Sequence, residues 1–329
     1  MRKYVSFLAP YLRAYLELKQ KLGYTSFARD VRPFDLDFFL AFHGIDSVRQ
    51  LNEELLIRWL HSMPHRSPTT RNHLLVFVRN FFDYLIRRGI MQDNLARRIP
   101  FFKEKPLKPY IYTLQEIQQI LQAARQRPPH PHSPLLGQTL EMLVLLIYAC
   151  GLRISETLNL KIQDVSFEEN TLALWNTKFH KERLVPFSPA IACKLQNYLA
   201  LRKKLCSLSS PDSPFFCHTK GKYKVAGPIE IHFRQLLIRC GLAKPKRGPR
   251  LHDLRHTFAV HRLYKWYQEG QNLLNKLPLL STYMGHVSVE NTQVYLTITT
   301  ALLREGDRRF SGAFEDVARK PLKRLLRMV

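Results

Sequence analysis

Apolar residues recur at helical spacing through most of the first hundred positions. The first such stretch forms one helix face with Phe7, Leu8, Tyr11, Leu12, Tyr15 and Leu16. Asn52 is placed to cap a short helix over Glu53–His61, and Ser67 or Thr69 is placed to start a longer one. We therefore predict a small module of four or five helices over residues 1–102.

A second helical pattern begins at Thr113, which can cap a helix over Leu114–Arg125. Glu116 stands at the third helical position and would complete a capping box. The run Leu140–Ala149 is apolar apart from Glu141, which predicts a buried helix. Further helices are expected over 188–204 and 229–240.

The only clear β pattern lies in the middle of the chain, with strands predicted over Thr171–Trp175 and Arg183–Pro186. The connection between them, Asn176–Glu182, reads as a turn that carries Lys178 and Lys181. The fold class expected from these elements is mainly α with a small antiparallel β-sheet.

Charge narrows the choice of partners. The 329 residues include 51 Lys and Arg against 26 Asp and Glu, a formal net charge of +25. This excess predicts a polyanionic partner, with a generic basic surface or an acidic membrane as alternatives. No apolar run reaches the roughly 18 residues of a spanning helix, and residues 1–4 do not open a signal peptide. We expect a cytoplasmic protein associated with the bacterial nucleoid.

The five cysteines are odd in number and form no C-x-x-C pair, so neither a disulfide framework nor a zinc ribbon is expected.

The residues best suited to chemistry lie within Leu251–Leu296. His252 and Arg255, at i and i+3, would share one helix face. An imidazole beside a guanidinium suits a phosphate, because Arg binds two oxygens while His donates or accepts a proton. His286 stands just past a helix-breaking glycine, and Tyr295 follows nine residues later. Each of these alone is more often structural, so the prediction rests on their order.

Arg153 is the other conspicuous charge. It follows a buried helix and a glycine turn, which is an unusual place for a solvated side chain. Glu156 is better suited to supporting this arginine, or to a helix N-terminus, than to acting as a base.

In order along the chain, the motifs G-L-R-x-S-E, H-x-x-R-H, G-H and Tyr resemble those of the tyrosine recombinases, the phage-integrase and Xer-like family. Residues 177–186 resemble the family hairpin G-K-G-x-K-x-R-x-V-P, with Thr177 and Phe179 in place of both glycines. The resemblance implies a catalytic set of Arg153, Lys178, His252, Arg255, His286 and Tyr295. Because both glycines are replaced, the choice between Lys178 and Lys181 stays open.

The resemblance also implies a two-domain, C-shaped DNA clamp. Its parts would be a helical core-binding domain at 1–102, a basic linker at 103–112, a catalytic domain at 113–305 and a basic tail at 306–329. The tail is either a frayed terminus or a helix that docks on a neighbouring subunit. DNA contacts are expected from Arg71, Arg79, Arg87, Lys103, Lys105 and Lys181, although a plain solvated face explains the first three equally well.

By this resemblance Tyr295 attacks a DNA phosphodiester and forms a 3′-phosphotyrosyl bond. Its proton would pass to His252, and Lys178 would protonate the departing 5′-oxygen. Arg153 and Arg255 would stabilise the charge of the transition state, and His286 would donate a further hydrogen bond. With two arginines at the phosphate, no metal ion or other cofactor is expected.

The function implied is site-specific recombination of double-stranded DNA in integration, excision or transposition of a mobile element. The partners would be further copies, as a dimer on one site and a tetramer in synapsis, or related recombinase subunits, with no membrane partner. Two alternatives remain: a catalytically silent DNA-binding accessory subunit, and a type IB topoisomerase or telomere-resolvase-like enzyme. An intact Tyr295 argues against the first.

Overall fold

The computed structural model divides into two compact units, Met1–Leu107 (unit 1) and Lys108–Val329 (unit 2). This division falls inside the range 103–112 that the sequence suggested as a linker. The structure describes residues 4–24, 32–104, 108–129, 133–175, 182–205, 210–218, 221–223, 226–244, 248–286, 288–290 and 292–298.

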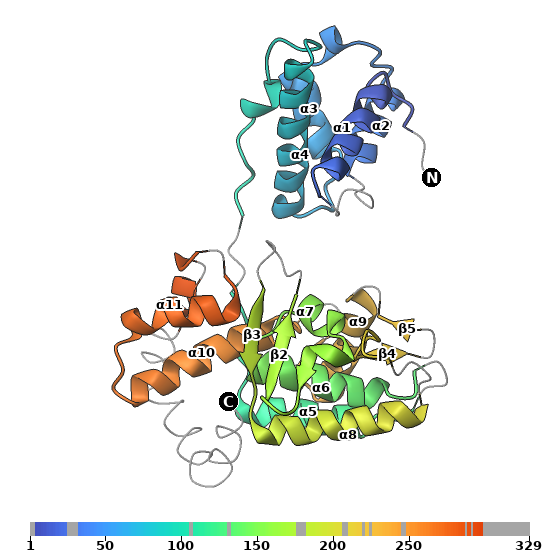
Figure 1. Cartoon of the computed structure of the whole chain (residues 1–329). Helices are drawn as coiled ribbons and strands as arrows, with labels where there is room; N and C mark the ends of the chain where they lie inside the picture. Colours follow the sequence, from blue (N-terminus) through green and yellow to red (C-terminus); the bar gives the residue numbers. More distant parts are fainter. Residues whose placement is uncertain are drawn as a thin grey trace. The chain divides into compact units, whose positions relative to one another are not determined.

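Unit 1 is a helical module, as the periodicity predicted (Figure 1). Its elements are α1 (Ala9–Lys21), α2 (Arg32–Phe42), η2 (Val48–Gln50), α3 (Glu53–His61), α4 (Pro68–Arg87) and η3 (Leu95–Arg97). The Asn52 side chain accepts a hydrogen bond from the main-chain N–H of Leu55, and that of Ser67 accepts one from Thr70, so both caps are confirmed. The apolar face of α4 packs against α1, α2 and α3 and forms the centre of the core.

Arg79, in the middle of α4, donates hydrogen bonds to one main-chain carbonyl within η3 and one just after it. Its Nε lies 3.0 Å from Ala96 O and its Nη2 lies 2.5 Å from Ile99 O. The guanidinium also stacks 4.2 Å from the Phe101 ring centroid. Arg79 therefore holds residues 96–101 against α4, a role that the spacing of arginines did not predict.

The other predicted DNA contacts in unit 1 differ in exposure. Arg87 and Lys103 are exposed, whereas Arg71 is half-buried with its Nη2 3.3 Å from Pro64 O. Lys105 lies outside the described residues. DNA contact by any of them stays a prediction.

Unit 2 contains α5 (Leu114–Arg125), α6 (Leu136–Ala149), α7 (Ile154–Asn159), η4 (Ile162–Asp164), α8 (Pro189–Leu205), α9 (Gly227–Arg239), α10 (Asp253–Gln268) and α11 (Leu273–Met284), and residues 292–298 are also helical. Its antiparallel sheet has the order β1 (Val165–Ser166), β2 (Thr171–Leu174), β3 (Arg183–Pro186). A second pair, β4 (Cys217–His218) and β5 (Gly221–Lys222), was not expected from the sequence. The mainly α fold with a small antiparallel sheet is confirmed.

The helix α6 lies at the centre of unit 2, packed against α5, α7, α8 and α10 (Figure 1). Within α6 every residue except Gln138 is buried, which confirms the buried helix and extends it four residues toward the N-terminus. The capping box at the start of α5 is confirmed by both bonds between Thr113 and Glu116. No helix in the described ranges is long and apolar enough to cross a membrane.

The contacts of Arg79 predict that its replacement destabilises the packing of residues 95–101 against α4, whereas replacement of Arg87 on the same helix does not. Arg79→Ala removes two charge-assisted hydrogen bonds and leaves two carbonyls unpaired, which costs about 2 kcal/mol. Hydrogen exchange should therefore show residues 95–101 of the intact chain opening about 30-fold more often. Arg87→Ala, a change at an exposed position of the same helix, should leave exchange unchanged. Equal exchange in the two variants would contradict a structural role for Arg79.

Candidate active site

The C-terminal end of α11 presents three consecutive main-chain carbonyls to three arginines. The pairs are Arg183 Nε with Tyr283 O (2.9 Å), Arg255 Nη2 with Met284 O (2.6 Å) and Arg153 Nη2 with Gly285 O (2.8 Å). The last carbonyls of a helix lack partners within it and carry partial negative charge, so cationic donors stabilise them. Arg153, Arg183 and Arg255 are referred to below as the arginine cluster.

One buried carboxylate, Glu156, binds the same cluster. Arg183 donates to both of its oxygens at 3.0 and 2.9 Å, and Arg153 Nη1 donates at 2.6 Å. Arg255 Nη1 lies 3.9 Å from Oε2, and the Glu156 side chain is only 3% exposed. Burial alone would raise the pKa of this carboxyl, but the hydrogen bonds from Arg183 and the Arg153 main chain, with the charges of Arg183 and Arg255, hold it below its usual value. The expectation that Glu156 supports Arg153 is confirmed by these contacts.

Two glycines make these contacts sterically feasible. Gly151 has φ +62°, and a Cβ there would lie 2.6 Å from the Phe258 ring. Its carbonyl accepts a hydrogen bond from Arg255 Nη1. Gly285 has φ +66°, and a Cβ there would lie 2.8 Å from Arg183 Nη1. Both positions need the left-handed backbone and the absence of a side chain, and both lie where the chain meets the arginine cluster.

Arg255 is the most deeply buried member, with its side chain 1% exposed. Burial, together with the positive charge of Arg153, lowers the pKa of Arg255 to about 9. This value is still above neutral pH, so the guanidinium keeps its proton.

The Tyr295 hydroxyl lies beside the cluster and is hydrogen-bonded to an imidazole. Its oxygen is 2.8 Å from Nδ1 of His256, and the residue is 3% exposed. Burial raises the pKa of the Tyr295 phenol above its usual value, although the charges of Arg255 and Arg153 oppose this effect. The phenol is therefore protonated at neutral pH in this structure.

The two histidines predicted to be catalytic lie on either side of this pair. The His252 ring centroid is 4.7 Å from that of His256, at 88°, and His252 is exposed at the start of α10. The His286 ring centroid is 6.2 Å from that of Tyr295, and its Nδ1 lies 2.8 Å from Thr292 Oγ1. Burial and the positive charge of the arginine cluster lower the pKa of His286 to about 4, so this imidazole is neutral at pH 7.

The structure thus brings five of the six predicted catalytic residues into one region: Arg153, His252, Arg255, His286 and Tyr295. Lys178 and Lys181 lie outside the described residues. Sequence reasoning did not assign roles to Arg183 and His256, although both stand inside the motifs that carried the resemblance. The catalytic roles themselves stay predictions. In the ranges that the structure describes, no group of three or more His, Cys, Asp or Glu side chains could hold a metal ion.

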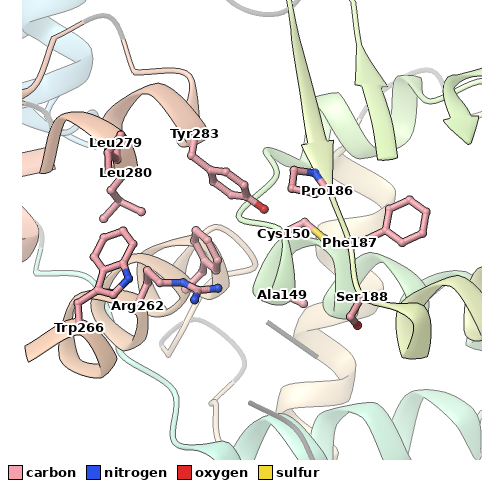
Figure 2. Close-up of a pocket in the computed structure, with 11 residues that line it drawn as sticks. Ala149, Cys150, Pro186, Phe187, Ser188, Arg262, Trp266, Leu279, Leu280 and Tyr283 are labelled. Carbon is pink, nitrogen blue, oxygen red and sulfur yellow. The ribbon is translucent and has the colours of Figure 1, made fainter. Parts of the chain in front are cut away.

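A pocket of about 400 Å³ adjoins this region and is mainly apolar (Figure 2). One wall is formed by Trp266 and Arg262 of α10 with Leu279, Leu280 and Tyr283 of α11, and the other by the end of α6 and the residues that follow β3. The side chain of Tyr283 lines this wall, and its main-chain carbonyl accepts a hydrogen bond from Arg183 of the arginine cluster.

Comparison with known proteins gives consistent results. Residues 111–301 match the sequence profile of the Phage integrase family. A protein of Sinorhizobium fredii named "Putative integrase/recombinase y4rB" is 33% identical over 93% of this chain and 97% of its own length. Tyrosine recombinase XerC of Oceanobacillus iheyensis is 31% identical over 69% of this chain and 70% of its own. In fold, the chain is similar to a lambda integrase dimer bound to a COC′ core site, with a TM-score of 0.65, 16% identity, and coverage of 88% of this chain and 76% of that one.

Glu156→Gln should destabilise unit 2, because the amide keeps the size of the side chain but leaves three guanidinium groups without their shared counter-charge. Removing one partner of a buried ion pair costs about 3–5 kcal/mol, and calorimetry of the full chain should show a melting temperature lower by roughly 6–12 °C for a 3 kcal/mol loss.

The difference in melting temperature between the wild type and Glu156→Gln should depend on pH. The pKa of Glu156 in the folded chain lies below the 4.5 that is usual for a glutamate side chain. Its contribution is thus present above about pH 4.5 and lost as pH falls through the folded value, so the gap between wild type and variant should narrow in acid. Glu168→Gln, at an exposed position, should melt like the wild type. Similar melting of both variants would mean that Glu156 does not hold the cluster together.

Proposed function

Because the chain belongs to the phage integrase family, and is a tyrosine recombinase, we propose that it cleaves and rejoins DNA at a specific site through a 3′-phosphotyrosyl intermediate formed by Tyr295. The observation that carries the proposal is the position of the Tyr295 hydroxyl, beside a buried cluster of arginines and bonded to an imidazole. A phenol is a useful nucleophile for a phosphodiester only when its proton can leave and the developing charge is stabilised.

Arg153 and Arg255 are the proposed ligands of the non-bridging oxygens of the scissile phosphate. Each guanidinium has five N–H donors, and the contacts with Glu156 and the α11 carbonyls use only some of them. Because these contacts fix the guanidinium planes before any DNA arrives, the positive charge needs no reorganisation during the reaction.

His286 supplies a further hydrogen bond in this proposal. When the Thr292 hydroxyl donates to Nδ1 of the neutral imidazole, the ring proton resides on Nε2. That N–H is the donor offered to a phosphate oxygen.

Lys178 is the proposed general acid that protonates the departing 5′-oxygen, and Lys181 a second basic residue of the same turn. A positioned ammonium group is needed because an alkoxide is a poor leaving group near neutral pH. The assignment rests on the alignment of residues 177–186 with the family hairpin.

Double-stranded DNA is the proposed substrate, and further copies of the chain or related recombinase subunits are the proposed partners. The net charge of +25 suits a polyanion, and the lambda integrase structure of similar fold is a dimer on a core site. Arg71, Arg87 and Lys103 in unit 1, with Lys105 and Lys181, are proposed phosphate contacts. Arg79 would contact a phosphate only through the N–H groups that do not bind the carbonyls of Ala96 and Ile99.

Integration, excision or transposition of a mobile element is the proposed setting. Relatives named as integrase/recombinase support it. A silent accessory subunit is disfavoured by the placement of the Tyr295 hydroxyl at the cluster. A type IB topoisomerase or telomere-resolvase-like activity would relax DNA or close hairpins without exchanging strands between two sites.

Tyr295→Phe should abolish covalent adducts, because the hydroxyl is the only group lost. Covalent adducts are trapped on nicked fragments of the DNA that flanks the gene, and the peptide linked to the DNA is mapped. The reaction contains excess EDTA, because the positive charge at the phosphate is attributed to Arg153 and Arg255 and not to a metal ion. Wild type should form a Tyr295 adduct, and the variant none while binding the same DNA. Tyr283→Phe serves as the matched control, because it removes a phenol hydroxyl nearby while keeping the main-chain carbonyl that binds Arg183. Adducts in Tyr295→Phe, or a strict need for a divalent ion, would refute the mechanism.

A substrate with a 5′-bridging phosphorothiolate distinguishes the two lysines, because a thiolate leaves without protonation. Cleavage by Lys178→Ala should fall about 10²–10⁴-fold on normal DNA, the usual contribution of a general acid, and recover on the sulfur substrate. Lys181→Ala should be no better on sulfur than on oxygen, since its defect would lie in binding. The reverse pattern would transfer the role of the acid to Lys181.

A further inference from the structure

We propose that His256, rather than His252, accepts the proton of Tyr295 during attack on DNA; this inference rests on the proposed function. Besides His286, two imidazoles lie near the Tyr295 hydroxyl, and the family resemblance assigned the proton to His252, the first histidine of the H-x-x-R-H motif that also contains His256. The structure distinguishes these two by distance and by exposure.

Distance favours His256. Its Nδ1 lies 2.8 Å from the Tyr295 hydroxyl oxygen, which allows direct transfer along an existing hydrogen bond. His252 is one turn earlier on α10, and its ring packs against that of His256 at 4.7 Å between centroids. His256 therefore lies next to both the hydroxyl and His252.

The helix α10 holds His256 in place. Its neighbours Arg255 and Thr257 are buried, and the Thr257 hydroxyl lies 3.0 Å from the main-chain nitrogen of Tyr112. His252, in contrast, is exposed at the first turn of the helix. A fixed, half-buried imidazole suits proton transfer to a buried phenol, whereas an exposed one is free to contact a phosphate oxygen.

The charges around His256 keep it neutral at rest. The groups that face it are Tyr295, His286, His252, Asp253, Arg250 and Arg255. Burial lowers the pKa of His256; Asp253 opposes this, while Arg250 and Arg255 add to it. When the Tyr295 phenol donates to Nδ1, the neutral ring carries its proton on Nε2 and the Nδ1 lone pair accepts the phenol proton.

The O–H bond of Tyr295 breaks and its proton bonds to Nδ1 of His256, while the phenolic oxygen forms a bond to phosphorus. The P–O5′ bond breaks, and the 5′-oxygen takes a proton from the general acid. In rejoining, the His256 imidazolium returns its Nδ1 proton to the departing phenolic oxygen.

Matched asparagine variants test the assignment. The side-chain oxygen of asparagine can occupy nearly the position of Nδ1, so His256→Asn keeps a hydrogen-bond acceptor for Tyr295 but cannot take its proton. The assay measures single-turnover cleavage across pH on the DNA mapped by adduct trapping. His256→Asn should cleave about 10²–10³-fold more slowly at pH 7. Its rate should rise with pH, because hydroxide must then ionise Tyr295.

The wild type should instead be level above the lowered pKa of His256 and decline in acid. His252→Asn should be slower but keep the acid limb of the wild type. The phosphorothiolate substrate should not rescue His256→Asn, since the missing function is that of a base.

Three results would overturn the inference: an unchanged acid limb in His256→Asn, loss of that limb in His252→Asn alone, or rescue of His256→Asn by the sulfur leaving group. Full activity of His256→Asn with an inactive His256→Ala would likewise overturn it, reducing His256 to a positioning group. Failure of the proposed function is distinguishable, because the wild type would then form no adduct at Tyr295.

Discussion

The interaction on which unit 2 depends is the binding of three guanidinium groups between one buried carboxylate and the carbonyl end of one helix. Glu156 neutralises part of the charge, and residues 283–285 supply one carbonyl to each arginine. The arginines come from the turn after α6, from β3 and from α10. Three distant parts of the chain are therefore joined at the point where α11 ends.

Burying three guanidinium groups requires free energy for their desolvation, and it fixes the orientation of their N–H donors. Charges removed from water must be paired and hydrogen-bonded, or the fold loses several kcal/mol. Here the compensating groups are a single carboxylate and fixed dipoles, so the cluster retains excess positive charge. If the proposed phosphate site is correct, the donors are oriented before the phosphate binds, which is the condition under which electrostatic stabilisation of a transition state is most effective.

Local features were predictable from the sequence because their physics is local. The caps at Asn52, Ser67 and Thr113 need only a side chain and the next helical turn, and the buried α6 follows from its apolar run. The partners of Arg79, Arg183 and His256 lie 17 to 100 residues away along the chain. No periodicity encodes contacts of that kind, so the sequence did not predict that Arg79 and Arg183 bind main-chain carbonyls. The short β4–β5 pair was missed for a related reason, since two-residue strands leave no alternation to detect.

The segment that follows α10 connects the arginine cluster to Tyr295, the proposed nucleophile. Residues 283–285 bind the arginines, His286 comes next, and Tyr295 lies nine residues beyond it. Tyr295, Phe258, Leu280 and Met284 also belong to one apolar cluster, so Tyr295 packs with the helix whose end binds the guanidinium groups. A displacement of the α11 end would therefore alter the arginine hydrogen bonds and the Tyr295 position together. The position of the α11 end therefore sets both the orientation of the three guanidinium groups and the packing of Tyr295, which couples the two parts of the proposed active site.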